Sequence, residues 1–284
     1  MINRITFLLT ALLLSGCGKP AQPVAMNHPP ERIISLAPNI TEAIYALGLD
    51  DKLVGVTTYC LYPEAARTLP KVGGFGQFNY EAIVTLQPDL VILHKEYDIE
   101  KERLASLGIP TLETGTYFIA DILETLRSIG EACGAAERAN ELIQGLETRI
   151  AEISHVGQAF QPARPRVLLT FGSGDIETIQ AFGPACLHNE LLAIAGGQNV
   201  IEGSLPFSTL SREAVLRLNP DIIIELAPEL NDGAKPSKHW KKLTAVNAVK
   251  NNRIYVLTGD YTCIPGPRFI QTLDDFSQII KQNN

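Results

Sequence analysis

The sequence lacks the short motifs that mark the common classes of enzyme. Neither G-x-G-x-x-G nor G-x-x-x-x-G-K-[ST] occurs, so a dinucleotide or nucleoside triphosphate site of the usual kind is not supported. The nucleophile elbow G-x-S-x-G is also missing, and His188-Asn-Glu190 does not match the H-E-x-x-H pattern of metalloproteases. An enzyme is therefore the weaker hypothesis, and turnover of a candidate substrate would be needed to revive it.

Metal-binding patterns are equally scarce. No C-x-x-C occurs, so neither a thiolate zinc site nor the common redox motif is supported. The five histidines are scattered without ligand spacing, which disfavours the binding of a bare metal ion. We therefore predict no metal site and no resident cofactor.

Cysteine is infrequent as well, with five residues in 284. Four of them follow position 17, namely Cys60, Cys133, Cys186 and Cys263. In an oxidising compartment these four could form two disulfides by any of three connectivities. They could equally remain isolated buried thiols, as the helical pattern around Cys133 suggests.

The chain has no cluster of Lys or Arg, and acidic residues outnumber basic ones by 31 to 24. A net charge of −7 argues against a nucleic-acid partner. Charged residues make up 19% of the chain and hydrophobic residues 45%, which favours a packed core over disorder. The length suits one large domain or two of ordinary size.

No apolar run is long enough to span a bilayer. The longest lies at the N-terminus, where Arg4 precedes the apolar segment 5–14, and it is typical of a signal peptide. Leu14-Ser-Gly-Cys17 follows and resembles a bacterial lipobox, which implies cleavage before Cys17 and lipidation of its thiol. An ordinary signal peptide with a chance cysteine is the alternative. The Pro-rich stretch beyond the cysteine has no hydrophobic period, and we interpret it as a flexible tether.

One long amphipathic helix is predicted from Ala135 to Gly157. Its apolar residues recur at spacings of three and four, which places them on one helix face: Leu142, Ile143, Leu146, Ile150 and Ile153. At 1.5 Å per residue such a helix spans roughly 35 Å, about the diameter of a small domain. It would join two similar lobes.

Strands alternate with helices on both sides of this helix. Short β-prone runs are expected at 32–36, 53–56, 90–93 and 110–112, and again at 166–170, 222–225 and 253–257. Such alternation predicts parallel sheets, because each return crossover needs a helix. The predicted fold is α/β, with two similar parallel-sheet lobes joined by one long backbone helix and a ligand cleft between them. The expected parts are a signal peptide (1–16), a tether (17–30), an N-terminal lobe (31–118), linking helices (119–160) and a C-terminal lobe (161–284).

An internal repeat supports the two-lobe plan. Phe75-x-x-x-Asn79-x-Glu81-Ala82-x-x-x-Leu86-x-Pro88-Asp89 matches the segment from Phe207 to Asp221 at a constant offset of 132 residues. A capped helix, a proline stop and a strand recur widely in proteins. The phenylalanine and the glutamate at equal offsets are not required by that general plan, so the repeat indicates two related lobes.

Aromatic residues are expected in loops that follow the strands, and parallel sheets bind ligands at that edge. The predicted ligand-binding residues are Tyr59, Tyr62 and Phe75 in the first lobe and Phe171, Phe207 and Tyr261 in the second. Singly each suits ordinary packing, but together they favour a large, flat, partly apolar ligand. Arg268 is a candidate for an anionic ligand group, or else a surface arginine at a helix start.

The chain resembles the helical-backbone class of bacterial substrate-binding proteins, which carry cobalamin, ferric siderophores or haem. The resemblance covers roughly residues 31–281. It rests on Arg32-Ile-Ile-Ser-Leu-Ala-Pro38 with Thr41-Glu42, Tyr59-Cys-x-Tyr-Pro63, Glu81-Ala-Ile-x-x-Leu-x-Pro-Asp-Leu-Val-Ile92, Ser211-Arg-Glu213 and Pro220-Asp221. It implies a lipid-anchored, monomeric protein, periplasmic or on the outer face of the cell membrane. Such a protein captures a ligand and delivers it to an ABC permease.

The resemblance also implies roles for single residues. Glu81 and Glu213 match the glutamates that dock on permease arginines. Among the ligands, the loop from Tyr59 and the positions of Phe75 and Phe207 are most similar to cobalamin binders, although Phe stands where tryptophan occurs there. A ferric siderophore would require more arginine, and haem could use Tyr59 or Tyr62 as an axial ligand. A tethered sensor that needs no permease is a further alternative.

Overall fold

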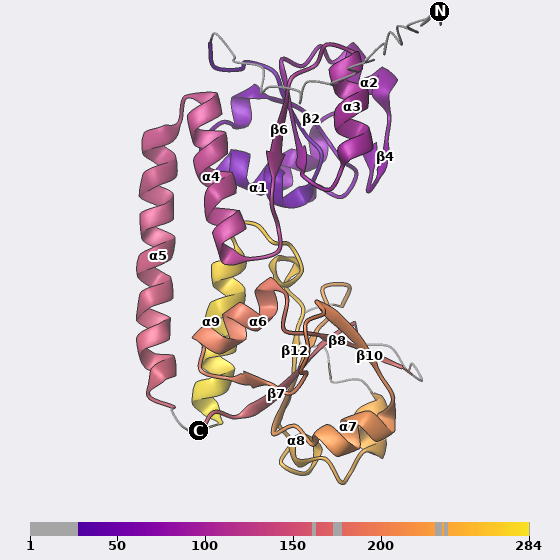
Figure 1. Cartoon of the computed structure of the whole chain (residues 1–284), viewed down its shortest axis with the longest axis vertical. Coiled ribbons are helices and arrows are strands. Elements are labelled where there is room, and N and C mark those ends of the chain that lie inside the picture. The colour runs from indigo at the N-terminus through magenta and orange to yellow at the C-terminus, as the bar shows by residue number, and fades with distance from the viewer. Residues whose placement is uncertain (1–27, 161–162, 173–177, 231–234, 236–237, 284) are drawn as a thin grey trace, which may run out of the picture.

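The computed structural model describes residues 28–160, 163–172, 178–230, 235 and 238–283. The predicted signal peptide, the lipidation of Cys17 and nearly all of the tether lie outside these residues. None of the described helices is long and apolar enough to cross a membrane. Two lobes lie one above the other along the long axis, and helix α5 (Ala136–Gln158) runs beside both of them (Figure 1).

The N-terminal lobe contains a parallel sheet of four strands in the order β2-β1-β5-β6. The strands are β1 (Ile33–Ser35), β2 (Leu53–Val56), β5 (Leu90–His94) and β6 (Thr111–Thr114). The lobe also holds α1 (Pro38–Ala46), α2 (Tyr80–Thr85), α3 (Asp98–Ser106) and a hairpin of β3 (Gly73–Gly74) with β4 (Gln77–Phe78). Each strand run expected in this lobe is confirmed to within two residues.

Helix α1 begins at Pro38. Proline suits the first helical position because its φ is already helical and no N–H is left unpaired there. Within the helix, the Thr41 hydroxyl donates to Ser35 Oγ at 2.8 Å.

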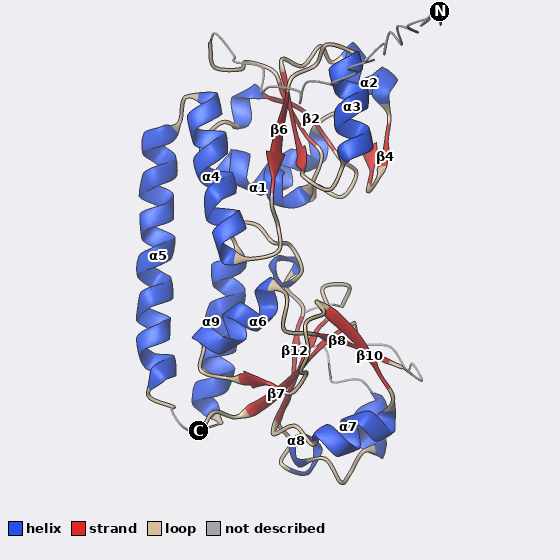
Figure 2. Ribbon diagram, viewed as in Figure 1, coloured by secondary structure: helices blue, strands red, loops and turns tan. Residues whose placement is uncertain are grey.

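The C-terminal lobe has a mixed sheet in the order β10-β8-β7-β11-β12, with β9 also paired to β7 (Figure 2). Its strands are β7 (Arg166–Phe171), β8 (Ile179–Phe182), β9 (Gln198–Asn199), β10 (Phe207–Leu210), β11 (Ile222–Leu226) and β12 (Ile254–Leu257). Helices α6 (Leu187–Ile194), α7 (Arg212–Leu218) and α8 (Asn247–Lys250) accompany them. The expectation that Phe207 lies in a loop was wrong, since Phe207 begins β10, which pairs antiparallel with β8.

The sequence repeat corresponds to equivalent structure in the two lobes. Asn79 and Ser211 each cap a helix by accepting a hydrogen bond from the backbone N–H three residues later. Each helix is followed by a residue in the left-handed region, Gln87 with φ 48° and Asn219 with φ 42°. The capped helix of the sequence repeat is therefore present in both lobes.

The aspartates of the repeat fix the strand that follows. Asp89 accepts hydrogen bonds from the backbone N–H groups of Glu31 and Arg32, and Asp221 accepts one from the N–H of Arg166. These bonds tie the start of the central strand pair together in each lobe. The repeated Pro-Asp is thus a structural element.

Two further long helices pack on the backbone helix. Helix α5 contacts α4 (Ile119–Cys133), which belongs to the predicted linking helices, as well as α9 (Phe269–Gln282) and α6. One hydrophobic core continues from Ile33 in the first sheet through Ile143 on α5 to Val167 in the second. The lobes therefore share a core as well as a connecting helix.

Two glycines on α5 allow a matched test of this packing. A Cβ at Gly157 would overlap the backbone carbonyl of Ile194 at the end of α6, whereas a Cβ at Gly145 would meet no atom within 4 Å. We expect Gly157→Ala to lower the free energy of unfolding by about 1–3 kcal/mol through overpacking. Gly145→Ala should raise it by about 0.5–1 kcal/mol, because alanine is the better helix former.

Urea titration of both variants measures these changes in stability. Equal stabilisation by the two substitutions would contradict the close approach of α5 and α6.

Candidate functional site

A cleft of about 720 Å³ lies between the two lobes. The N-terminal lobe contributes the start of α1 and residues that follow β2, β5 and β6, and the C-terminal lobe contributes Phe171 and the segment 263–265. A second hollow of about 220 Å³ shares Phe171 and Tyr117 with the first and extends to Phe207. Most of the lining is apolar, which suits a large and partly apolar ligand.

Exposed rings form the wall on the N-terminal lobe. Phe75 at the tip of the β3–β4 hairpin is 78% exposed, and Tyr59 is 58% exposed. Phe75 meets the edge of Tyr97 at a centroid distance of 6.2 Å, and Tyr97 in turn stacks on His94 at 5.9 Å. The less exposed Tyr97 therefore supports the ring that projects into the cleft.

The wall on the C-terminal lobe is built in the same way. Phe171 is the last residue of β7 and Phe207 is the first residue of β10. Both were predicted to lie in loops, and that prediction was wrong. Both rings contact the buried Phe182, at centroid distances of 6.0 and 5.6 Å. His188 packs behind Phe182 at 4.1 Å and donates from Nε2 to the Thr262 carbonyl. Burial lowers the pKa of His188 to about 4, so the imidazole is neutral.

The cleft has little charge. None of the described residues that line the two hollows is Lys or Arg, and Glu96 is an acid on the N-terminal wall. Burial also lowers the pKa of His94, so a neutral imidazole donates from Nε2 to Asn39 Oδ1 at 2.9 Å. The cleft is therefore suited to a ligand without strong net negative charge.

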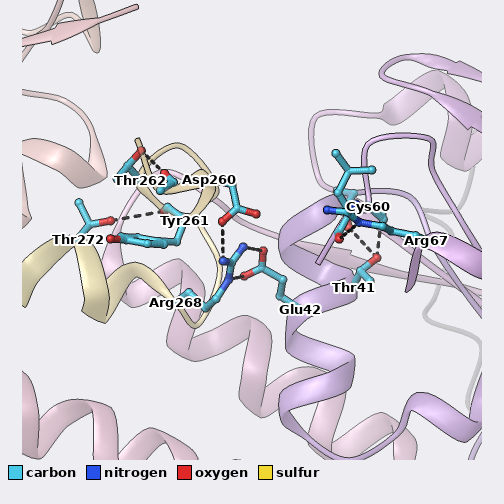
Figure 3. A network of polar contacts seen from close by, with 12 residues as sticks. Thr41, Glu42, Cys60, Arg67, Asp260, Tyr261, Thr262, Arg268 and Thr272 are labelled. Atoms are coloured by element: carbon cyan, nitrogen blue, oxygen red, sulfur yellow. Dashed lines mark hydrogen bonds and ion pairs between the residues drawn. The ribbon is translucent and has the colours of Figure 1, made fainter. Parts of the chain in front are cut away.

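Four of the seven predicted ligand-binding residues line these two hollows: Tyr59, Phe75 and Phe171 line the cleft, and Phe207 lines the second hollow. The remaining three, Tyr62, Tyr261 and Arg268, lie together outside their lining. The guanidinium of Arg268 lies 3.7 Å from the Tyr62 ring centroid and is paired with Glu42 and Asp260 (Figure 3). Tyr261 donates its hydroxyl to Asp275 Oδ2 at 2.8 Å. A ligand role for these three residues stays a prediction. In the structure, Arg268 forms ion pairs with two carboxylates of the protein itself.

Glu81 and Glu213 occupy the second position of α2 and α7, and both side chains are exposed. Hydrogen bonds, first with the Ser211 side chain, lower the pKa of Glu213 and keep it ionised. Helices α2 and α7 belong to different lobes and lie on the side of the molecule away from α5 (Figure 1). The two glutamates thus hold equivalent, exposed positions in the repeat.

Comparison with known proteins identifies the class. The periplasmic binding protein family matches residues 33–261. The chain belongs to this family. Its sequence is 29% identical to the ABC transporter substrate-binding lipoprotein YvrC of Bacillus subtilis, over 96% of this chain and 94% of that one. It is 32% identical to the vitamin B12-binding protein of Yersinia pestis, over 75% of this chain and 73% of that one.

Solved structures agree with the fold. The periplasmic vitamin B12 binding protein of Vibrio cholerae superposes with a TM-score of 0.78 at 26% identity, covering 90% of this chain and 98% of that one. The periplasmic heme-binding protein of Roseiflexus gives 0.75 at 27% identity, with 89% and 98% covered. This periplasmic binding protein is therefore the substrate-binding component of an ABC transporter and not an enzyme, as the missing motifs predicted.

Sequence reasoning missed several residues of this periplasmic binding protein's site. His94 ends β5, Glu96 and Tyr97 come just after it, and Tyr117 follows β6. The rule that ligands bind at carboxyl strand ends could therefore have found them. Phe182 lies on β8, a strand that the sequence reading did not predict. No comparable signal pointed to it.

All four described cysteines of the binding protein are free thiols, which answers the open question of disulfides for these residues. Cys263 lines the cleft and is partly exposed, and burial raises its pKa to about 11. A raised pKa keeps the thiol protonated at neutral pH, and only the thiolate reacts with alkylating agents. We therefore expect alkylation of Cys263 by iodoacetamide to keep rising about tenfold per pH unit above pH 9.

Mass spectrometry of the Cys263 peptide from pH 7 to pH 10 measures this reaction. In urea the same thiol should level off near pH 8.5, the ordinary pKa of a free cysteine. A plateau at that pH in the folded protein would contradict the environment described for Cys263.

Proposed function

We propose that this binding protein captures a cobalamin or a related corrinoid and delivers it to an ABC permease. The observation that carries the proposal is the pair of aromatic walls facing one wide cleft, with Tyr59 and Phe75 on one lobe and Phe171 and Phe207 on the other. Rings of this kind offer flat apolar contact area at small entropic cost. A corrin macrocycle is broad, flat and partly apolar.

Charge supports the corrinoid over its rivals. Haem carries two propionates and many ferric siderophores are anionic, so each would be favoured by a cationic side chain at the site. The described lining residues include no Lys or Arg, and Arg268 is engaged by two carboxylates. Cyanocobalamin has no net charge and avoids this cost of desolvation.

Haem remains the second candidate for a specific reason. Tyr59 presents an exposed phenol on the cleft wall, and a tyrosinate oxygen can serve as an axial ligand to ferric haem. Proteins named as heme-binding also share the fold at 25–27% identity.

Delivery requires a surface that the permease recognises, and we propose that Glu81 and Glu213 form it. Each glutamate is followed one helical turn later by an exposed apolar side chain, Val84 at 47% and Leu216 at 40% exposure. Residues three apart on a helix share a face. Each lobe therefore presents a carboxylate beside an apolar contact, an arrangement suited to a cationic partner with approximate two-fold symmetry.

We also propose that the mature protein is anchored by a lipid on Cys17. Support comes from the lipobox-like Leu14-Ser-Gly-Cys17 and from the relative in Bacillus subtilis that is named a lipoprotein. An anchored protein would remain close to its permease.

Calorimetric titration of the purified protein tests the ligand. Cyanocobalamin, haem and a panel of ferric siderophores are each added to the same preparation. Tight one-to-one binding of cyanocobalamin alone is the expected result. Binding of haem or a siderophore without cyanocobalamin would discard the corrinoid and leave the transport role in place.

A further inference from the structure

An arginine of the C-terminal lobe is held by the N-terminal lobe. Arg268 precedes α9, and its guanidinium donates from Nε to Glu42 Oε2 at 2.9 Å and from Nη2 to Glu42 Oε1 at 2.5 Å. Glu42 lies on α1, 226 residues earlier in the chain, and is only 3% exposed. Figure 3 shows the two parallel bonds of this ion pair. Such a two-point contact fixes orientation as well as distance.

Arg268 makes two further contacts, one with each lobe. The face of its guanidinium covers the ring of Tyr62, which belongs to the N-terminal lobe, at 3.7 Å from the centroid. The third nitrogen, Nη1, donates to Asp260 Oδ1 at 2.7 Å, and Asp260 belongs to the same lobe as Arg268. Glu42 and Tyr62 are therefore contacts between lobes, whereas Asp260 is a contact within one lobe.

The pair lies beside the cleft. Ile264 and Pro265, just before Arg268, line the cleft together with Pro38 and Asn39 at the start of α1. A Cβ at Gly266 would lie 3.0 Å from Glu42 Oε2 and 3.3 Å from the Cα of Asn39, so the two backbones already pack closely. The ion pair thus joins the two segments at which the walls of the cleft meet.

We propose that Glu42 and Arg268 are positioning residues that hold the two lobes in the mutual orientation from which the cleft binds its ligand. Neither residue lines the cleft, so the effect on the ligand passes through the lobes. Hydrophobic packing between the lobes is non-directional, so the shared core does not by itself fix how one lobe is rotated relative to the other. The two parallel hydrogen bonds of the ion pair favour one relative orientation. The link to ligand affinity rests on the proposed function, but the link to lobe orientation does not.

Conservative variants test the pair, because removal of a whole partner would leave a buried charge uncompensated. Glu42→Gln keeps the side-chain volume, and Arg268→Lys keeps the charge but loses the planar two-point donor. Asp260→Asn is the matched control, because it alters a carboxylate on the same arginine without touching a contact between lobes. Each variant is compared with the wild type in the absence of ligand by amide hydrogen exchange and by small-angle X-ray scattering.

Glu42→Gln and Arg268→Lys should raise hydrogen exchange about tenfold at the start of α1 and at 264–268, with the central strands β5 and β11 unchanged. Their radius of gyration should exceed that of the wild type and of Asp260→Asn. The affinity for cyanocobalamin should fall about tenfold in the same two variants. Exchange and scattering that match the Asp260→Asn control would overturn the proposal. Wild-type protein that fails to bind cyanocobalamin would overturn the corrinoid assignment alone, since the ligand-free comparison would still decide the role of the pair.

Discussion

Replacement of both Phe75 and Phe207 by alanine should weaken the binding of cyanocobalamin by about 30- to 1,000-fold. The two side chains are 78% and 57% exposed in the ligand-free protein, so a ligand placed between the lobes would remove much of their surface from water. Complete burial of one phenylalanine is worth about 1.5–3 kcal/mol, and partial burial of two gives about 2–4 kcal/mol. Phe75→Tyr should retain most of the affinity because the flat ring remains.

The same calorimetric titration measures this loss. Ile99→Ala is the control, because Ile99 is 77% exposed but does not line the cleft. Both substitutions remove exposed apolar surface, so folding stability should change little in either variant. Equal affinity of the double variant and the Ile99→Ala control would show that the aromatic walls do not hold the ligand.

The repeat explains why the architecture could be predicted from sequence. Asn79 and Ser211 act through short-range geometry, because a cap needs only the three residues that follow it. The run Leu90 to Leu93 is apolar on both faces, which is typical of a strand in a covered parallel sheet. Signals of this kind are complete within ten residues, so a linear reading finds them.

Strands β8 and β10 could not be found in this way. Residues 207–210 alternate in exposure along the strand, but only two of the four are large and apolar, which is a weak signal. Their assignment depends on antiparallel pairing between Phe207 and Phe182, 25 positions apart. Since pairing with a distant partner decides the outcome, the local sequence was insufficient, and these two antiparallel strands were missed beside the parallel strands that the sequence predicted.

Arg268 shows the same limit within the site. Its sequence context, Pro-Gly-Pro-Arg, indicates an arginine at the start of a helix but not which anion it faces. Its partner Glu42 is 226 residues away and was interpreted only as part of a family motif. Burial raises the pKa of Glu42, although the neighbouring arginine acts to lower it. Burial depends on residues that are far away in the sequence, so this pKa shift could not be predicted from the local sequence.

Loss of both glutamates of the proposed docking surface should have the largest effect on transport. In Glu81→Ala with Glu213→Ala we expect docking on the permease to weaken by about 100-fold, because each charged contact is worth at least about 1.5 kcal/mol. Cyanocobalamin affinity should be unchanged, since neither glutamate lines the cleft. Each single variant should show a smaller loss, and the two losses should be similar because the positions are equivalent in the repeat.

A control must separate docking from the change in net charge. Glu137→Ala with Glu147→Ala removes the same two negative charges from exposed positions on α5, on the opposite side of the molecule from α2 and α7. Uptake of radiolabelled cyanocobalamin by cells that carry each variant measures delivery, and calorimetry on the purified variants measures capture. Reduced uptake with intact capture, seen in the Glu81 and Glu213 variant only, is expected from a docking surface. If the Glu81 and Glu213 variant shows the same uptake as the α5 control, the paired glutamates do not serve docking. That outcome would favour a tethered sensor, which needs no permease.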